Sequence, residues 1–176
     1  MFSRIGGAVV LAAILAAAPA VAAPAAPAPA KDIPAGGLTL NEVVAWLQAA
    51  GYRAQIVADS DGKSHVSSAT QGVDFGVYIY DCNKDGRCGS IQFSAGWARH
   101  GTFDVTRMNE WNRDNRWARG YYDKVNDPWL EYDVDLSPGG TYELLNDELA
   151  LWDSLVPRFI KLYKLNEDIP PPAAAK

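Results

Sequence analysis

The sequence contains few cysteines and few histidines, and these shortages exclude several classes of protein. It has two of each among 176 residues. Two cysteines are too few for a disulfide-built scaffold or a four-cysteine zinc site. Lys and Arg number 16 against 21 Asp and Glu, and the net charge of -5 argues against nucleic-acid binding, which requires a basic surface. The motifs G-x-S-x-G, H-E-x-x-H and C-x-x-C do not occur, so the common hydrolase, metalloprotease and redox signatures are missing.

The first 22 residues have the three parts of a secretory signal. Arg4 supplies a positive charge, Ile5–Ala18 is apolar, and the small residues Ala20 and Ala22 stand where a signal peptidase reads the chain. A retained anchor is the alternative, but an apolar run of roughly 14 residues is shorter than the ~20 that a bilayer requires. We predict cleavage, no stable membrane span afterwards, and a periplasmic or secreted protein.

Proline and alanine dominate both ends of the remaining chain. Residues 23–37 form a Pro/Ala-rich linker, because alternating Pro and Ala favour extended polyproline II over helix or sheet. Residues 166–176, with three consecutive prolines, are predicted to be a disordered tail. A hydrophobic content of 48% and six tryptophans are enough to build one folded domain, which we place at residues 38–165.

The domain begins with a helix and two strands. Thr39 and Glu42 have the spacing of a capping box, apolar residues follow with helical periodicity, and Gly51 ends the predicted helix. Tyr52–Val57 and a weaker Ser64–Ala69 are predicted strands, separated by turn residues.

The two cysteines fix the register of the next hairpin. If Cys82 faces Cys88 across a five-residue turn, Ile79 meets Ile91 and Val77 meets Phe93. Extending the register pairs Phe75 with Ala95 and Val73 with Trp97. A slip by one residue would break both the cysteine pair and the apolar face. In an exported protein we therefore predict a structural Cys82–Cys88 disulfide that contributes about 2 kcal/mol through chain entropy. A redox-active pair is the less favoured alternative, because such pairs usually occur as C-x-x-C at a helix start.

Three further elements complete the domain. Asp104–Asn115 is predicted to be a short helix with Val105, Met108 and Trp111 on one side. Trp117–Val125 and Trp129–Leu136 form a second hairpin. In its second strand Leu130, Tyr132, Val134 and Leu136 face the core, while Glu131, Asp133 and Asp135 face water. A long amphipathic helix covers Leu145–Tyr163, with a kink or break expected near Pro157. The fold class is α+β, an antiparallel sheet of hairpins flanked by helices in the order α-β-β-β-β-α-β-β-α.

Candidate metal and catalytic groups have simpler structural interpretations. Asp81, Asn83 and Asp85 match the first half of an EF-hand loop, but the bidentate Glu is missing and the flanks are strands. Turn chemistry explains these residues, and a weak calcium site is the alternative.

His65 and His100 are expected to be solvated surface residues. The acidic triplet of the second hairpin could supply paired carboxylates for glycoside hydrolysis, but a solvated sheet face has the same pattern. We predict no cofactor.

Charge is distributed unevenly along the chain. Arginines outnumber acids between residues 107 and 119, whereas residues 127–153 contain eight acids and no Lys or Arg. Cross-strand pairing within the second hairpin explains part of this pattern. The alternative is a dipolar surface that orients a protein partner or a second copy of the chain. The contact residues that we predict, where they are exposed, are Trp111, Arg113, Arg116, Trp117, Arg119 and Trp129.

These segments resemble the YbjN-domain family of bacterial proteins. The resemblance rests on Glu110-Trp-Asn-Arg113, on Arg116-Trp-Ala-Arg119 before an aromatic strand, on the acidic-apolar strand that follows, and on Trp152–Phe159. It covers about residues 38–163 and implies a fold similar to type III secretion chaperones, often dimeric, that acts by binding polypeptides. The family is known as a sensory transduction regulator without an established activity. This chain departs from the family pattern in its signal peptide and its cysteine-stapled hairpin.

We therefore predict an exported, non-enzymatic binding or regulatory module whose partner is a protein or a second copy of itself. A small envelope hydrolase with an unrecognised site and a weakly calcium-modulated binding protein are the alternatives.

Overall fold

The computed structural model describes residues 32–98 and 104–165. The predicted signal peptide, the linker up to residue 31, the tail 166–176 and His100 lie outside the described residues. None of the described helices is long and apolar enough to cross a membrane. The elements are β1 (Asp32–Ile33), α1 (Leu40–Ala49), β2 (Gln55–Ala58), β3 (Ser64–Thr70), β4 (Val73–Cys82), β5 (Cys88–Gly96), α2 (Val105–Asp114), β6 (Arg119–Tyr122), β7 (Pro128–Asp135), β8 (Gly140–Thr141) and α3 (Tyr142–Tyr163).

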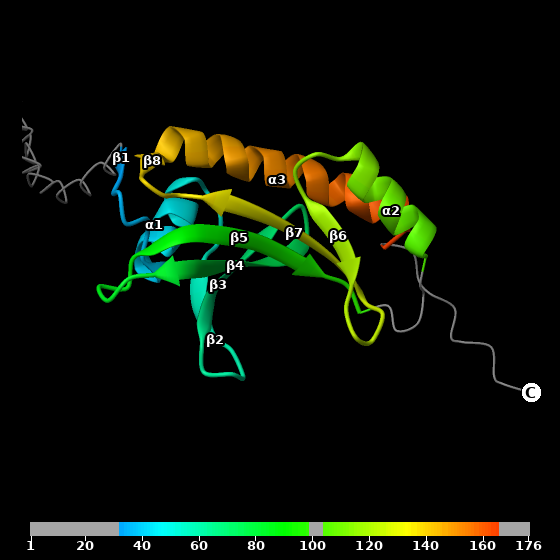
Figure 1. Cartoon of the computed structure of the whole chain (residues 1–176), viewed down its shortest axis with the longest axis horizontal. Coiled ribbons are helices and arrows are strands. Elements are labelled where there is room, and N and C mark those ends of the chain that lie inside the picture. Colours follow the sequence, from blue (N-terminus) through cyan, green and yellow to red (C-terminus); the bar gives the residue numbers. More distant parts are fainter. Residues whose placement is uncertain (1–31, 99–103, 166–176) are drawn as a thin grey trace, which may run out of the picture.

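The architecture is α+β, as predicted. Six antiparallel strands form one sheet in the order β2-β3-β4-β5-β7-β6, and β1 pairs with β8 in a separate two-stranded ribbon. The predicted order of a helix, four strands, a helix, two strands and a helix is confirmed, with the short β1 and β8 in addition. Figure 1 shows α3 running along one side of the sheet with α2 beside its C-terminal half, while the β2–β3 hairpin extends away on the opposite side.

The β4–β5 hairpin, which contains the two cysteines, has the predicted register. Ile79 pairs with Ile91, Val77 with Phe93, and Cys82 with Cys88. The ladder ends at Gly76 and Ser94, so the extension to Phe75 and Val73 is not part of the pairing. The strand that we predicted to begin at Tyr52 begins at Gln55 instead. The backbone N–H of Tyr52 donates to the carbonyl of Leu47, so Tyr52 still belongs to the C-terminal end of α1.

The helices bury their apolar stripes on one face of the sheet, around Phe93 of the central strand β5. Trp152 of α3 stacks on the Phe93 ring at 5.6 Å, and Trp46 of α1 approaches it edge-on at 6.3 Å. Trp111 of α2 contacts Phe159 of α3 at 5.0 Å. All three helices therefore share one core.

Two details of the helices differ from the sequence expectation. α3 continues through Pro157 without a break. Proline removes one donor to the carbonyl of Asp153, and the side-chain amide of Gln71 donates to that carbonyl at 2.8 Å instead. Val105, which we expected on one side of its helix with Met108 and Trp111, is 55% exposed, because it lies in the first turn of α2 beyond the packed region.

Candidate functional site

One face of the six-stranded sheet carries the side chains that point away from the helices. We call it the open face. Its residues alternate with the core residues of each strand and come from β3, β4, β5, β7 and β6: His65, Tyr78, Tyr80, Ser90, Gln92, Ser94, Trp129, Glu131, Asp133, Asp135, Arg119 and Tyr121. Among the described elements, the helices pack on the other face, so these side chains form an aromatic and polar surface outside the core.

Two aromatic rings of the open face lie directly above glycines. A Cβ on Gly96 would come within 2.5 Å of the Trp129 indole, and one on Gly76 within 2.7 Å of the Tyr78 ring. His65 stacks on Tyr78 with ring centroids 4.7 Å apart. Only glycine gives the rings room to lie so close to the backbone. The result is a shallow aromatic surface rather than a set of projecting side chains.

Glu131 organises one end of the open face. Its carboxylate accepts two hydrogen bonds from the Arg119 guanidinium, at 2.5 and 3.1 Å, and one from the Tyr121 hydroxyl at 2.8 Å. We expected Glu131 to face water, and this was wrong: it is 8% exposed. Arg119 and Tyr121 on the neighbouring strand cover the carboxylate and satisfy its oxygens, which makes burial of the charge possible.

Gln92 connects the middle of the open face. Its amide donates to Asp133 at 2.8 Å, and its carbonyl oxygen accepts from the Tyr80 hydroxyl at 3.2 Å. Burial raises the pKa of Tyr80, and the nearby carboxylates of Glu131 and Asp133 raise it further. Burial likewise raises the pKa of Tyr121, helped by its hydrogen bond to Glu131. Both hydroxyls therefore remain neutral hydrogen-bond donors at ordinary pH.

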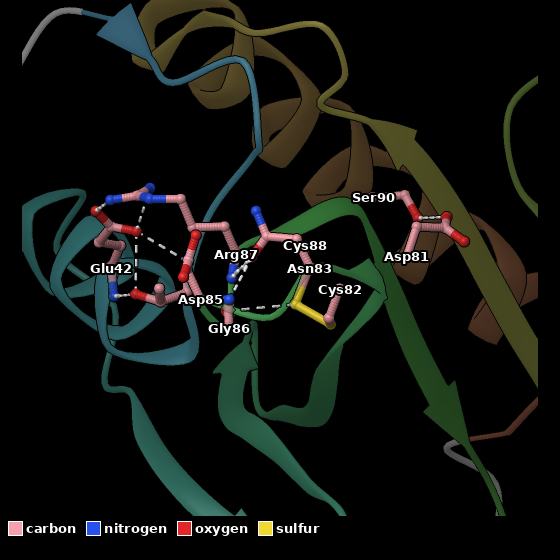
Figure 2. Close-up of a disulfide and its surroundings, with 10 residues drawn as sticks. Glu42, Asp81, Cys82, Asn83, Asp85, Gly86, Arg87, Cys88 and Ser90 are labelled. Carbon is pink, nitrogen blue, oxygen red and sulfur yellow. Dashed lines mark hydrogen bonds and ion pairs between the residues drawn. A yellow bond between two sulfur atoms is a disulfide. The ribbon is translucent and has the colours of Figure 1, made fainter.

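The open face has more acidic than basic side chains. Its arginine already has a partner, because Arg119 pairs with Glu131, and the His65 ring is hydrogen-bonded to Asp59 at 2.8 Å. Among the described residues, Asp81, Asp133 and Asp135 form no ion pair with Lys, Arg or His. Asp133 and Asp135 lie on β7, and the positive φ of Asp81 turns its carboxylate toward Ser90, which donates to it at 2.8 Å (Figure 2). We call these three carboxylates the acidic end of the open face, and Tyr80 lies beside them with 45% exposure.

The predicted disulfide closes the adjacent hairpin. Cys82 and Cys88 are joined across the turn shown in Figure 2. Inside the turn, the side-chain oxygen of Asn83 accepts from the backbone N–H groups of Asp85 and Arg87, at 2.9 and 3.1 Å. The side-chain oxygen of Asn83 is thus used in shaping the turn. The described residues contain no group of three or more His, Cys, Asp or Glu placed to hold a metal ion.

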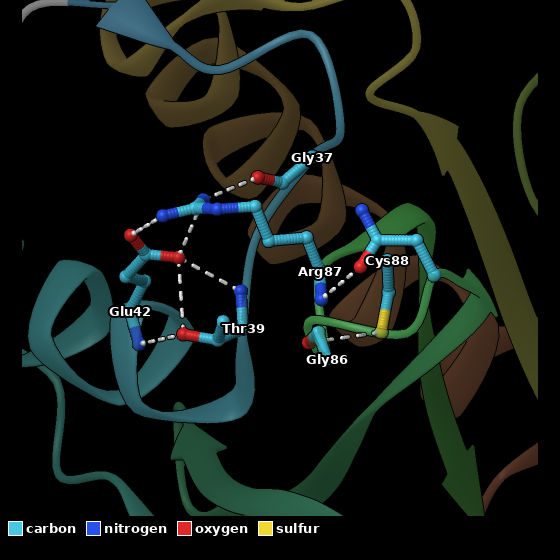
Figure 3. Close-up of polar contacts among 7 residues, drawn as sticks. Gly37, Thr39, Glu42, Gly86, Arg87 and Cys88 are labelled. Carbon is cyan, nitrogen blue, oxygen red and sulfur yellow. Dashed lines mark hydrogen bonds and ion pairs between the residues drawn. The ribbon is translucent and has the colours of Figure 1, made fainter.

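Arg87, the residue before Cys88, ties this hairpin to α1. Its guanidinium donates to both oxygens of Glu42, at 2.8 and 3.0 Å, and to the carbonyl of Gly37 at 2.9 Å (Figure 3). Glu42 also accepts from the backbone N–H of Thr39, which completes the predicted capping box. Partial burial alone would raise the pKa of Glu42, but the bonds from Thr39 and Arg87 outweigh it and lower the pKa. Sequence reasoning missed the contribution of Arg87, because nothing in the spacing shows that the turn meets the helix.

The predicted contact residues do not form one cluster. Trp111 is buried in the core, where its indole N–H donates to the carbonyl of Ala118 at 3.0 Å. Arg113 pairs with Asp114 on the surface of α2. The Arg116 guanidinium lies over the exposed Trp117 ring at 4.7 Å, in the loop before β6. Arg119 and Trp129 lie on the open face and are the two that the fold brings to the same surface.

The histidine expectation needs one correction. His65 is not a solvated surface residue: its side chain is 15% exposed, stacked on Tyr78 and bonded to Asp59. Within the described part of the chain, no serine hydroxyl bonds to this ring. The His65–Asp59 bond therefore lies within the β2–β3 hairpin, and the stacking of His65 on Tyr78 joins this hairpin to β4.

Comparisons with known proteins identify a family and a shared fold. Among curated proteins, none matches the chain. Residues 39–162 match the family YbjN, described as "Putative bacterial sensory transduction regulator". A solved structure, described as "Crystal structure of YbjN, a putative transcription regulator from E. coli", superimposes with a TM-score of 0.54 at 14% identity. The match covers 73% of this chain and 95% of that one, which shows that the two share a fold. The chain belongs to the YbjN family.

Proposed function

We propose that this chain is an exported, non-enzymatic regulatory module that binds a positively charged segment of a protein partner on its open face. The family description supports a regulatory role. The observation that carries the proposal is the combination of a shallow aromatic surface with three carboxylates that lack cationic partners among the described residues. Lys and Arg side chains suit both features, because they pair with carboxylates and also pack on aromatic faces.

The remaining groups of the open face are already arranged for binding. The buried polar side chains, Gln92 and Glu131, have their hydrogen bonds satisfied within the sheet. They hold Tyr80, Arg119 and Tyr121 in fixed positions before any partner arrives. A pre-organised surface loses little conformational entropy on binding, so modest contacts can give useful affinity.

A lysine-containing probe tests this proposal. The probe is a ten-residue peptide of alternating Ala and Lys, titrated into the chain beginning at Ala23 and followed by calorimetry. Replacing Asp133 and Asp135 by Asn should weaken binding about fivefold, since each exposed charge pair contributes about 0.2–1 kcal/mol. The matched control replaces Glu143 and Asp147 of α3 by Gln and Asn, which removes the same charge elsewhere and should leave the affinity unchanged.

The same titration separates the alternatives. Equal weakening by both double variants would mean that only net charge matters, and the open face would not be the site. Light scattering on the mature chain tests whether a second copy is the partner. A dimer that dissociates in the Asp133/Asp135 variant and not in the control would place the second copy on the open face, in place of a different protein.

Export is tested separately. A disulfide persists in oxidising compartments such as the periplasm, and the Cys82–Cys88 bond fits that environment. Mass spectrometry of the protein from the cell envelope should find a mature N-terminus at Ala23. Recovery of the full-length chain from the cytoplasmic fraction would contradict export without affecting the binding proposal.

A further inference from the structure

A groove lies on the helical side of the molecule, away from the open face. It is about 400 Å³ in volume and runs between α1 and the start of α3. Trp46 and Tyr142 form its aromatic walls, and Ala45 and Ala49 leave it open between them. Asn146 and Glu42 also line it, and the Glu42 carboxylate is held by Arg87. This volume falls in the range of ligand-binding pockets, roughly 300–1,000 Å³.

The polar groups of the groove suit a polypeptide backbone. The Trp46 indole N–H donates to the side-chain oxygen of Asn146 at 2.8 Å, which directs the amide NH₂ of Asn146 elsewhere. Within the described residues, neither that NH₂ nor the Tyr142 hydroxyl has a hydrogen-bond partner. Aromatic walls with two donors are the features that recognise polyproline II segments, whose carbonyls have no internal hydrogen bonds.

The chain itself has such a segment at the right place. β1 pairs antiparallel with β8, with Asp32 opposite Thr141, and Tyr142 follows Thr141 directly. Continuing this direction backwards from Asp32 leads toward Tyr142 and the mouth of the groove. Residues 23–31 read Ala-Pro-Ala-Ala-Pro-Ala-Pro-Ala-Lys and span about 28 Å as polyproline II.

The C-terminal prolines are less well placed. They follow Leu165, at the far end of a 22-residue helix that is about 33 Å long. The eleven residues 166–176 would span about 34 Å when extended. The whole tail would be used in reaching the groove, and no residues would be left to occupy it.

We propose that the groove between α1 and α3 holds the chain's own Pro/Ala-rich segment, residues 23–31. The contact is intramolecular, so an effective concentration in the millimolar range makes a weak interaction sufficient. This interaction does not depend on the open face or on its partner.

Nuclear magnetic resonance of the chain beginning at Ala23 tests the contact through the Trp46 indole N–H, assigned by comparison with Trp46→Phe. Replacing Pro24, Pro27 and Pro29 by Gly should shift this resonance, because the polyproline II preference is lost. Replacing Pro170, Pro171 and Pro172 by Gly is the matched control and should leave it unchanged. A synthetic peptide of residues 23–31, added at millimolar concentration, should restore the original position.

A second variant measures the other side of the contact. Ala45 is exposed on α1, so Ala45→Gln fills the groove without disturbing the core. The backbone amides of residues 23–31 should then move to the shifts of the free peptide. Identical Trp46 resonances in the two proline variants would overturn the proposal. A Trp46 shift that depends on protein concentration would also overturn it, because the segment would then come from a second copy.

Discussion

Arg87 links two parts of the chain that are 45 residues apart in sequence. Arg87 lies in the turn closed by the disulfide, and its guanidinium connects this turn to the cap of α1 and to the carbonyl of Gly37, just before that helix (Figure 3). The planar fork of arginine can contact both oxygens of Glu42 and a carbonyl at once, whereas the lysine ammonium is a single point. The position of this one side chain therefore affects a helix start and a hairpin together.

Arg87→Lys should lower the free energy of unfolding by about 1 kcal/mol near neutral pH, because the paired hydrogen bonds to Glu42 are lost. The pKa of Glu42 is lower in the folded chain than its ordinary value of 4.5. The stability from this contact is therefore present above pH 4.5 and is lost as the pH falls through the folded pKa.

Urea denaturation of both proteins across acidic pH measures this difference. The gap between wild type and Arg87→Lys should close at low pH, where Glu42 is protonated. A gap that stays constant down to the lowest pH would show that the salt bridge does not account for it.

α2 protects one edge of the sheet, at β6. The side chain of Asn112 donates to the carbonyl of Gly120 at 3.0 Å and accepts from its N–H at 2.8 Å. The amide thus provides the two bonds that a neighbouring strand would otherwise make. Sheet edges without such protection promote association between chains.

Asn112→Ala should destabilise the fold by about 1–3 kcal/mol, since Gly120 loses both partners. It should also cause association that increases with concentration, as the free edge pairs between molecules. Asn109→Ala, an exposed position on the same helix, is the control. Sedimentation of both variants separates the two effects, and a monomeric, fully stable Asn112→Ala would contradict the protective role.

The disulfide acts at the level of the β4–β5 hairpin. Replacing Cys82 and Cys88 by Ala removes a crosslink that closes a short loop, and about 2 kcal/mol of stability should be lost. Reductant should lower the free energy of unfolding of the wild-type chain by the same amount. The double variant should show no response to reductant. A double variant with the same denaturation midpoint as the wild-type chain would mean that Asn83 and Arg87 alone hold the turn.

Features that depend on neighbours in sequence could be predicted, and features that depend on distant partners could not. The Cys82–Cys88 register and the capping box of α1 follow from local spacing, and both are confirmed. A kink or break was expected near Pro157, but α3 is not broken there, and Gln71, far away in sequence, bonds to the freed carbonyl. The expectation that Glu131 faces water failed for the same reason. Alternation along the strand predicts which face of the sheet carries Glu131, but a single sequence does not show that Arg119 of the neighbouring strand covers its carboxylate.

At the scale of the whole molecule, the helices lie on one face of the sheet and the open face lies on the other. The sheet therefore separates two surfaces with different chemistry. The helical side has a groove lined mainly by Ala, Trp and Tyr, with the single carboxylate of Glu42, whereas the open face has surplus carboxylates. Changes to one surface should leave the other unaffected, which makes the two binding proposals independently testable.

The tyrosines provide a measurement of the whole fold. All eight have a pKa above the ordinary value of 10, and the largest cause is burial, which disfavours the charged phenolate. For Tyr52, burial and the hydrogen bond to Asp153 raise the pKa to about 12. A raised pKa means that the folded state favours the neutral hydroxyl. The stability from these groups is fully present below pH 10 and is lost as the pH rises through the folded values.

Phenolate absorbance near pH 10 should therefore be lower in the folded chain than in guanidinium, and it should rise steeply at higher pH as ionisation and unfolding occur together. In guanidinium, all eight should ionise near pH 10. Tyr52→Phe should remove one phenolate and raise the stability in alkali relative to wild type, since the charge that opposes folding is gone. A phenolate signal near pH 10 as large as that in guanidinium, with circular dichroism still native, would show that the tyrosines are more solvated than this packing allows.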